Sequence, residues 1–168
     1  YPYRHRVREL MSSPPIFVAA EAPLDEALKI LTDRRISSLF VTPPGKKPDA
    51  GPFLGAESGI ITERDVLRAI CKETPAVLQK PAGAFASRPL ASVAADSFVY
   101  RAIGRMDRLK VRHLGVVDAA GYIAGALTAR DLLRLRAGDA VRLGDEIDEA
   151  ADVHELGQAW SHLPAVAR

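Results

Sequence analysis

The sequence predicts an α+β fold in which two β-α-β-β-α repeats pack together as a pseudo-symmetric pair, followed by an extra helical segment at the C-terminus. Two observations lead to this prediction: the 168-residue chain repeats itself, and each copy carries short apolar strand patterns around an amphipathic helix pattern. A third observation is size. One copy of about 55 residues would be marginally stable alone, whereas two copies can share a core.

The internal repeat is visible when the sequence is shifted by 75 residues. Between residues 11 and 43, 8 of the 33 aligned pairs are identical. Farther along, the shift becomes 66, and 6 of the 10 pairs between residues 59 and 68 are identical. The change of shift places a nine-residue insertion in the first copy. It falls in the Pro- and Gly-rich segment 43–52, which we expect to form a surface loop.

Each copy begins with a short strand pattern, at residues 16–19 and 92–95. An amphipathic helix pattern follows, with apolar residues at i, i+3, i+4 and i+7. These residues are Leu24, Ala27, Leu28 and Leu31 in the first copy and Val99, Ala102, Ile103 and Met106 in the second. Two further strands are expected in each copy, at residues 39–41 and 59–61 and at residues 114–117 and 123–127. A second helix then starts at Thr62 or Thr128.

These patterns divide the chain into four parts. They are the first repeat with an N-terminal arm (residues 1–71), a linker (72–81), the second repeat (82–136) and a C-terminal helical extension (137–168). The extension carries an apolar stripe around Trp160, which we expect to be buried at an oligomer contact, with burial on the chain's own core as the alternative. Because the chain starts at Tyr1 without Met, we expect it to be excised from a longer protein.

Three segments carry a resemblance to a known family. Residues 59–65 and 125–131 share Gly, two apolar residues, Thr, two variable residues and Asp, and residues 111–118 are similar to the family's second-strand segment. Over residues 7–136 the chain resembles a tandem pair of cystathionine-β-synthase (CBS) domains, a Bateman module. The resemblance implies a regulatory module, not an enzyme, that binds an adenosine-containing ligand (AMP, ADP, ATP or S-adenosylmethionine) in clefts between the repeats.

The resemblance also implies roles for individual residues. Asp65 and Asp131 would accept hydrogen bonds from the ribose hydroxyls, and Thr62 and Thr128 would contact phosphate. Further residues expected on the phosphate side are Arg64, Arg130, Arg112 and His113, with Ser37 and Ser38 as the first-copy counterparts of the last two. Backbone near Ile16, Val18 and Val93 would flank the base.

Two alternatives remain open at these positions. Thr-x-x-Asp at the start of a helix also fits a capping box, in which both side chains satisfy backbone N–H groups, and capping and ligand binding can coexist. The two clefts should also differ, because Ser37 and Ser38 stand where the second copy has Arg112 and His113. One cleft could therefore be empty, and Arg112 and His113 could be exposed edge residues without a ligand.

Composition excludes several classes of function. The net charge of +2 gives no general attraction for nucleic acid, and we give the basic arm of residues 4–8 little weight as a nucleic-acid site. No apolar stretch approaches the length of a membrane helix, and no signal-peptide pattern opens the chain. We therefore expect a cytoplasmic protein without membrane contact. The single cysteine, Cys71, is expected to be a packed thiol, and the four histidines lack metal-ligand spacing.

Expected partners are the adenosyl ligand, a second copy in a homodimer and a covalently attached downstream domain. In the family, such dimers often form through the amphipathic helices that carry the Leu24 and Val99 stripes or their neighbours. Residues 143–168 resemble the start of a nucleotidyltransferase-like region that follows such pairs in some bacterial signalling proteins. Two rival functions follow: a structural dimerisation module with empty clefts, and the regulatory half of a nucleotidyltransferase-like enzyme.

Overall fold

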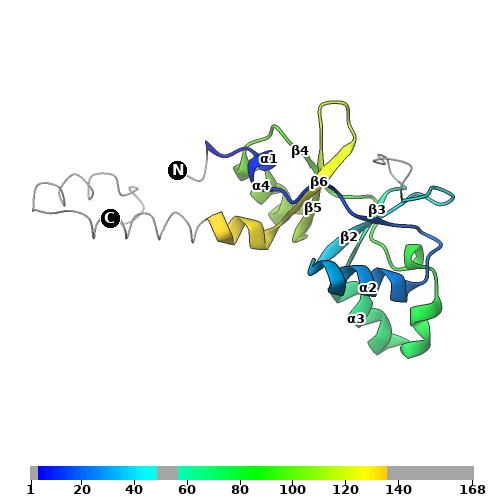
Figure 1. Ribbon diagram of the computed structural model, residues 1–168. Coiled ribbons are helices and arrows are strands. Elements are labelled where there is room, and N and C mark those ends of the chain that lie inside the picture. The colour runs from blue at the N-terminus through cyan, green and yellow to red at the C-terminus, as the bar shows by residue number, and fades with distance from the viewer. Residues whose placement is uncertain (1–3, 49–56, 136–168) are drawn as a thin grey trace, which may run out of the picture.

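The computed structural model describes residues 4–48 and 57–135 and shows two small α+β units side by side (Figure 1). The first contains β1 (Phe17–Val18), α2 (Leu24–Arg34), β2 (Ser38–Val41), β3 (Gly59–Thr62) and α3 (Glu63–Lys72). The second contains β4 (Ser92–Ala94), α4 (Val99–Leu109), β5 (His113–Val117) and β6 (Ile123–Thr128), and residues 129–135 are helical. The predicted β-α-β-β-α order is therefore confirmed in both repeats.

Both sheets have the same topology. Their strand orders are β1-β2-β3 and β4-β5-β6, and in each the first strand runs parallel to the second while the third is antiparallel to it. A helix must connect the two parallel strands, because a tight hairpin can join only antiparallel strands. The helices α2 and α4 are these crossovers, and each ends in a residue with left-handed backbone, Arg35 or Lys110.

Each repeat has its own core beneath its crossover helix. In α2 the side chains of Leu24, Ala27 and Leu31 are buried, and in α4 those of Val99, Ala102 and Met106 are buried. One expectation from the stripes is wrong, because Ile103 is 48% exposed. The buried members of the Leu24 and Val99 stripes pack within the chain, whereas Ile103 stays exposed on α4, and a dimer contact through these helices or their neighbours stays a prediction.

A third apolar cluster joins the two sheets. Phe40 and Ile60 of the first repeat and Ile123 of the second are buried together, with Phe17 and Leu90 packed around them. The rings of Phe17 and Phe40 lie 5.5 Å apart between centroids. This cluster confirms the expectation that the repeats pack sheet against sheet.

The segments that lead into β1 and β4 are exchanged between the repeats. Residues 5–8, which include the start of α1 (Val7–Leu10), bond to the second repeat: Val7 N–H donates to Ser97 O (2.9 Å), and Val99 N–H donates to His5 O (3.0 Å). The segment after η2 (Pro75–Gln79), through η3 (Ala82–Ala84), makes the matching bonds to the first repeat; for example, Ala82 N–H donates to Ala22 O (2.7 Å). Each repeat is completed by the leader of the other.

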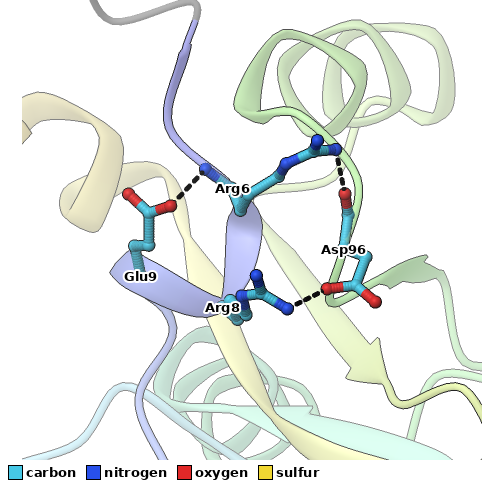
Figure 2. Close-up of polar contacts among 4 residues, drawn as sticks. All are labelled: Arg6, Arg8, Glu9 and Asp96. Carbon is cyan, nitrogen blue, oxygen red and sulfur yellow. Dashed lines mark hydrogen bonds and ion pairs between the residues drawn. The ribbon is translucent and has the colours of Figure 1, made fainter.

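Side chains reinforce the N-terminal crossing. Arg6 donates to the backbone oxygen of Asp96 (2.6 Å), Arg8 contacts the Asp96 carboxylate, and the Arg6 N–H donates to Glu9 (3.2 Å) (Figure 2). The Arg6 guanidinium also lies 3.8 Å from the centroid of the Phe98 ring. The basic arm is thus held on the second repeat by these contacts.

The crossing leaders explain the glycines of the two motifs. Ser12 pairs with Ala126 and Ser87 pairs with Ile60 through backbone bonds of 2.8 to 3.1 Å. A Cβ on Gly125 would lie 2.5 Å from Ser12 O, and one on Gly59 would lie 3.0 Å from the Ala86 Cβ. At Gly125 only glycine lets the leader run this close to the strand, whereas at Gly59 a side chain would require Ala86 to shift slightly.

Three smaller expectations concern the insertion, Cys71 and the C-terminal extension. Residues 44–48 of the predicted insertion are exposed, as expected of a surface loop, and its remaining residues lie outside the described ranges. Cys71 is exposed, so the expectation of a packed thiol is wrong. The C-terminal extension at residues 137–168, with its Trp160 stripe, also lies outside the described ranges.

Candidate functional site

The two Thr-Asp pairs adopt nearly identical geometry at the starts of their helices. Thr62 donates to Asp65 Oδ2 through both its backbone N–H (2.9 Å) and its hydroxyl (2.8 Å), and the Asp65 N–H donates back to Thr62 Oγ1 (3.2 Å). Thr128 and Asp131 repeat these three bonds at 2.8, 2.8 and 3.3 Å. The capping-box alternative is therefore confirmed in both copies.

The cap leaves part of each aspartate available. All of the bonds from the threonines go to Oδ2, and within the described residues Oδ1 of Asp65 and of Asp131 takes part in no hydrogen bond. An ionised carboxylate can accept about four hydrogen bonds. Each aspartate can thus fix the helix start and accept bonds from a ligand at the same time.

Asp65 lies in a cleft between the repeats, here called cleft A, with a volume of about 420 Å³. Its first wall is the start of α3, including Thr62, Arg64 and Arg68. Its second wall comes from the other repeat, where the turn after α4 and the start of β5 supply the residues Lys110, Val111, Arg112 and His113. The leader residues Ser87, Pro89 and Ala91 complete the lining.

Asp131 lies in the pseudo-symmetric counterpart, cleft B, with a volume of about 120 Å³. Thr128, Arg130 and Arg134 come from the second repeat, and Ser12 comes from the crossing leader. The opposite wall is supplied by the turn after α2 and the start of β2, which contribute the residues Arg35, Ile36, Ser37 and Ser38. Each cleft is therefore built from both repeats.

Cleft A is rich in cations, but His113 is not one of them at neutral pH. Burial lowers the pKa of His113, although the nearby carboxylates of Asp65, Asp131 and Glu63 partly oppose that effect. The imidazole Nε2 forms a hydrogen bond with Ser37 Oγ (3.2 Å), which joins the two repeats between the clefts. Positive charge in cleft A therefore comes from Lys110 and the arginines, while His113 serves as an uncharged hydrogen-bonding group.

The structure brings most of the sequence-predicted site residues together. Cleft A holds Thr62, Arg64, Asp65, Arg112, His113 and Ser37, and cleft B holds Thr128, Arg130, Asp131, Ser37 and Ser38. Three others lie elsewhere. Val18 is a buried core side chain, Val93 borders a separate cavity beside α4, and Ile16 lies before β1, outside the residues that line either cleft.

Sequence reasoning missed several lining residues. Lys110 and Arg35 occupy equivalent positions under the 75-residue shift, and Arg68 and Arg134 are equivalent under the 66-residue shift. The repeat alignment contained this signal, because residues that are equivalent in the two copies should line equivalent clefts. The leader residues gave no such signal, since their crossing between repeats is a tertiary feature.

The described residues contain neither a candidate metal site nor a candidate membrane span. No group of three His, Cys, Asp or Glu side chains among them is placed to hold a metal ion. No helix in residues 4–48 or 57–135 has both the length and the apolar character needed to cross a membrane.

Comparisons with known proteins agree with the fold. The family model for the CBS domain matches residues 7–72 and 82–138. No curated protein matches the chain. A CBS domain protein of Pyrobaculum aerophilum, solved in complex with AMP, is 27% identical with a TM-score of 0.64, and the match covers 79% of this chain and 99% of that one.

Two further solved structures are similar. The CBS domain pair of protein MJ0100, in complex with 5′-methylthioadenosine and S-adenosyl-L-methionine, is 25% identical with a TM-score of 0.65, and the match covers 80% of this chain and 98% of that one. The CBS domain of a bacterial CNNM/CorC family Mg²⁺ transporter, in complex with ATP, is 22% identical with a TM-score of 0.63 and coverage of 82% and 90%. At 22% identity, the last match supports similarity of fold only.

Proposed function

Because the chain belongs to the CBS domain family and carries two copies of the domain, we propose that it is a regulatory module that binds adenosine-containing ligands in clefts A and B. One observation carries the proposal. In each cleft an aspartate that caps a helix keeps one carboxylate oxygen without a hydrogen-bond partner among the described residues, and the other repeat supplies part of the same cleft. Both repeats contribute to both clefts, so a ligand in either cleft contacts the two repeats at once.

The free oxygen suits the ribose. A carboxylate that accepts hydrogen bonds from the two vicinal hydroxyls would hold the sugar at the start of the helix, where unpaired N–H groups and the helix dipole also favour negative charge nearby. Asp65 in cleft A and Asp131 in cleft B would take this role, with Thr62 and Thr128 beside them. The ligands in two similar structures, AMP in one and S-adenosylmethionine with methylthioadenosine in the other, all contain the adenosine group.

The cations of cleft A suit phosphate. Lys110 and Arg112 of the second repeat line the cleft together with Arg64 and Arg68 of the first, and Glu63 is the one carboxylate besides Asp65 among its lining residues. Guanidinium groups bind phosphate oxygens through paired N–H donors. Cleft B also holds cations, the three arginines Arg35, Arg130 and Arg134. We assign ADP or ATP to cleft A because its volume of about 420 Å³ exceeds the 120 Å³ of cleft B, which suits a ligand with fewer phosphates.

A ligand bound in cleft B would contact the segments that lead to both ends of the module. Ser12 belongs to the N-terminal leader, and Arg130 and Arg134 belong to the helix that leads toward the C-terminal extension. A ligand that binds one arrangement of these elements more tightly shifts the population toward it. This coupling is how the module would signal to a covalently attached domain, in a cytoplasmic protein and without catalysis of its own.

A structural role as a dimerisation module is the second candidate, and one observation favours a dimer. Leu67 and Leu133 are equivalent under the 66-residue shift, and each is 64% exposed on its helix. Large apolar side chains repeated on one kind of helix face indicate an association surface. The homodimer is proposed through these helices.

Thermal denaturation with a ligand panel tests the proposal. The panel is adenosine, AMP, ADP, ATP and S-adenosylmethionine, with GTP as the control for general phosphate binding. A ligand at 100 times its Kd should add about 2.7 kcal/mol to the free energy of unfolding. A rise in Tm with adenosine compounds, and less with GTP, would support the proposal. No rise with any compound would leave the dimerisation module as the function.

A further inference from the structure

A cavity of about 600 Å³ lies beside α4, away from both clefts. One wall is a stripe of α4 made of Arg101, Gly104, Arg105 and Arg108, and the other is β4 with Ser92 and Ala94. The three arginines span about 10 Å along the helix at a rise of about 1.5 Å per residue. No Asp or Glu is among the residues that line the cavity.

The positive charge of this stripe has no partner in the described part of the chain. Of the carboxylates on or next to α4, Asp96 contacts Arg8 (Figure 2) and Asp107 pairs with Lys110 (2.9 Å). Arginines at i, i+4 and i+7 on one helix face repel one another. The fold does not require them, because the equivalent first-repeat positions carry Glu26, Ile30 and Asp33.

A glycine in the middle of the arginine stripe, Gly104, also points to a ligand. It lies inside α4, where glycine is less favourable than alanine by about 1 kcal/mol. Its φ is not positive, and a Cβ built on it would meet nothing within 4 Å, so packing does not explain the glycine. A ligand that approaches the helix backbone between the arginines would explain it.

The opposite wall supplies further donors. Gly115 N–H donates to Ala91 O and Ala95 N–H donates to Val117 O, so the residues that flank β4 on either side bond to β5. Ser92 and Ala94, between them, direct their backbone N–H groups away from β5. The hydroxyls of Ser92 and Ser97 also lie in the lining.

We propose that this cavity binds a phosphate-chain anion, held by Arg101, Arg105 and Arg108 above Gly104. Paired N–H donors of arginine fit phosphate oxygens, and a short chain of phosphates matches a stripe of cations better than one phosphate group does. The first repeat has no such site, because its equivalent stripe is acidic and the equivalent of Val117, Thr42, is buried under the loop that begins at Pro43. The site is independent of adenosine binding in the clefts.

Calorimetric titration of the intact chain with inorganic tripolyphosphate tests the site. Arg105→Gln should weaken binding about tenfold, the loss of one hydrogen-bonded charge. Gly104→Glu should abolish binding by placing a carboxylate among the arginines, and the helix tolerates it because the position is open. Arg34→Gln, on an exposed arginine of α2 outside all three cavities, is the matched control and should bind like the parent chain.

Several outcomes would overturn the proposal. They are no binding by the parent chain, equal binding by the parent, Arg105→Gln and Gly104→Glu, or loss of binding in Arg112→Ala alone, which would place the phosphates in cleft A. A parent chain that binds a polyglutamate peptide but not tripolyphosphate would mark the stripe as a peptide surface and refute the proposal as well. Binding of ATP that is weakened by Arg105→Gln would support it and show that a nucleoside polyphosphate is an accepted source.

Discussion

Replacing the capping aspartate of cleft A by its amide separates its two roles. In Asp65→Asn the amide oxygen can still accept the bonds that Thr62 makes at 2.8 and 2.9 Å, so most of the cap is kept. The negative charge near the helix N-terminus is lost, which should lower the free energy of unfolding by about 0.3–1 kcal/mol. The ribose loses a charged acceptor, and bonds to charged groups are worth about 1.5–3 kcal/mol, or roughly 10- to 150-fold in Kd.

The assay is calorimetric titration with AMP and ATP, next to urea unfolding of the same preparations. Asp131→Asn is the matched variant, because its cap has the same geometry in the smaller cleft. We expect the loss in binding free energy for ATP in Asp65→Asn to be larger than the loss in the free energy of unfolding. If both single variants and the double variant bind like the parent, the aspartates are caps only and the assignment of the ribose to them is refuted.

Three further perturbations have defined outcomes. Arg112→Ala should raise the Kd for ATP and ADP in calorimetry and leave that for adenosine nearly unchanged; an equal loss for all three would rule out a phosphate contact. Because burial lowers the pKa of His113 below its ordinary 6.5, the unfolded chain takes up that proton first as the pH falls. The free energy of unfolding should therefore decrease as the pH falls below about 6.5. If it decreases just as steeply in His113→Gln, protonation of His113 is not the cause. Phe40→Ala should cost about 3–5 kcal/mol in urea unfolding, since Phe40 is 2% exposed between the sheets; a cost below about 1 kcal/mol would show that the sheets do not depend on this cluster.

The local elements could be predicted from the sequence because their signals are local. The i, i+3, i+4, i+7 stripes identified α2 and α4, and the Thr-x-x-Asp motifs marked the starts of the helices after β3 and β6. Identity between the copies then placed equivalent residues in equivalent sites. The position of Thr62 and Asp65 at the strand-helix junction follows from this repeat alone.

The features that the sequence did not reveal depend on packing between distant segments. Nothing local indicates that residues 5–8 complete the second repeat, because their bonds to Ser97 and Val99 are backbone bonds. The same crossing brings Ser12 into cleft B and Ser87 into cleft A, while Val18 and Val93 point into cores. Exposure of Ile103 likewise depends on what packs beside α4, which helical periodicity does not specify.

The central claim is that the clefts bind the adenosine group, and direct titration of the intact chain with AMP and ATP tests it most simply. The account expects saturable binding of both nucleotides, with ATP binding more tightly because cleft A supplies Lys110 and Arg112. Binding of ATP should persist in Gly104→Glu, since that variant alters the separate cavity beside α4. Absence of binding of either nucleotide at millimolar concentration, in a chain that unfolds cooperatively, would contradict the account.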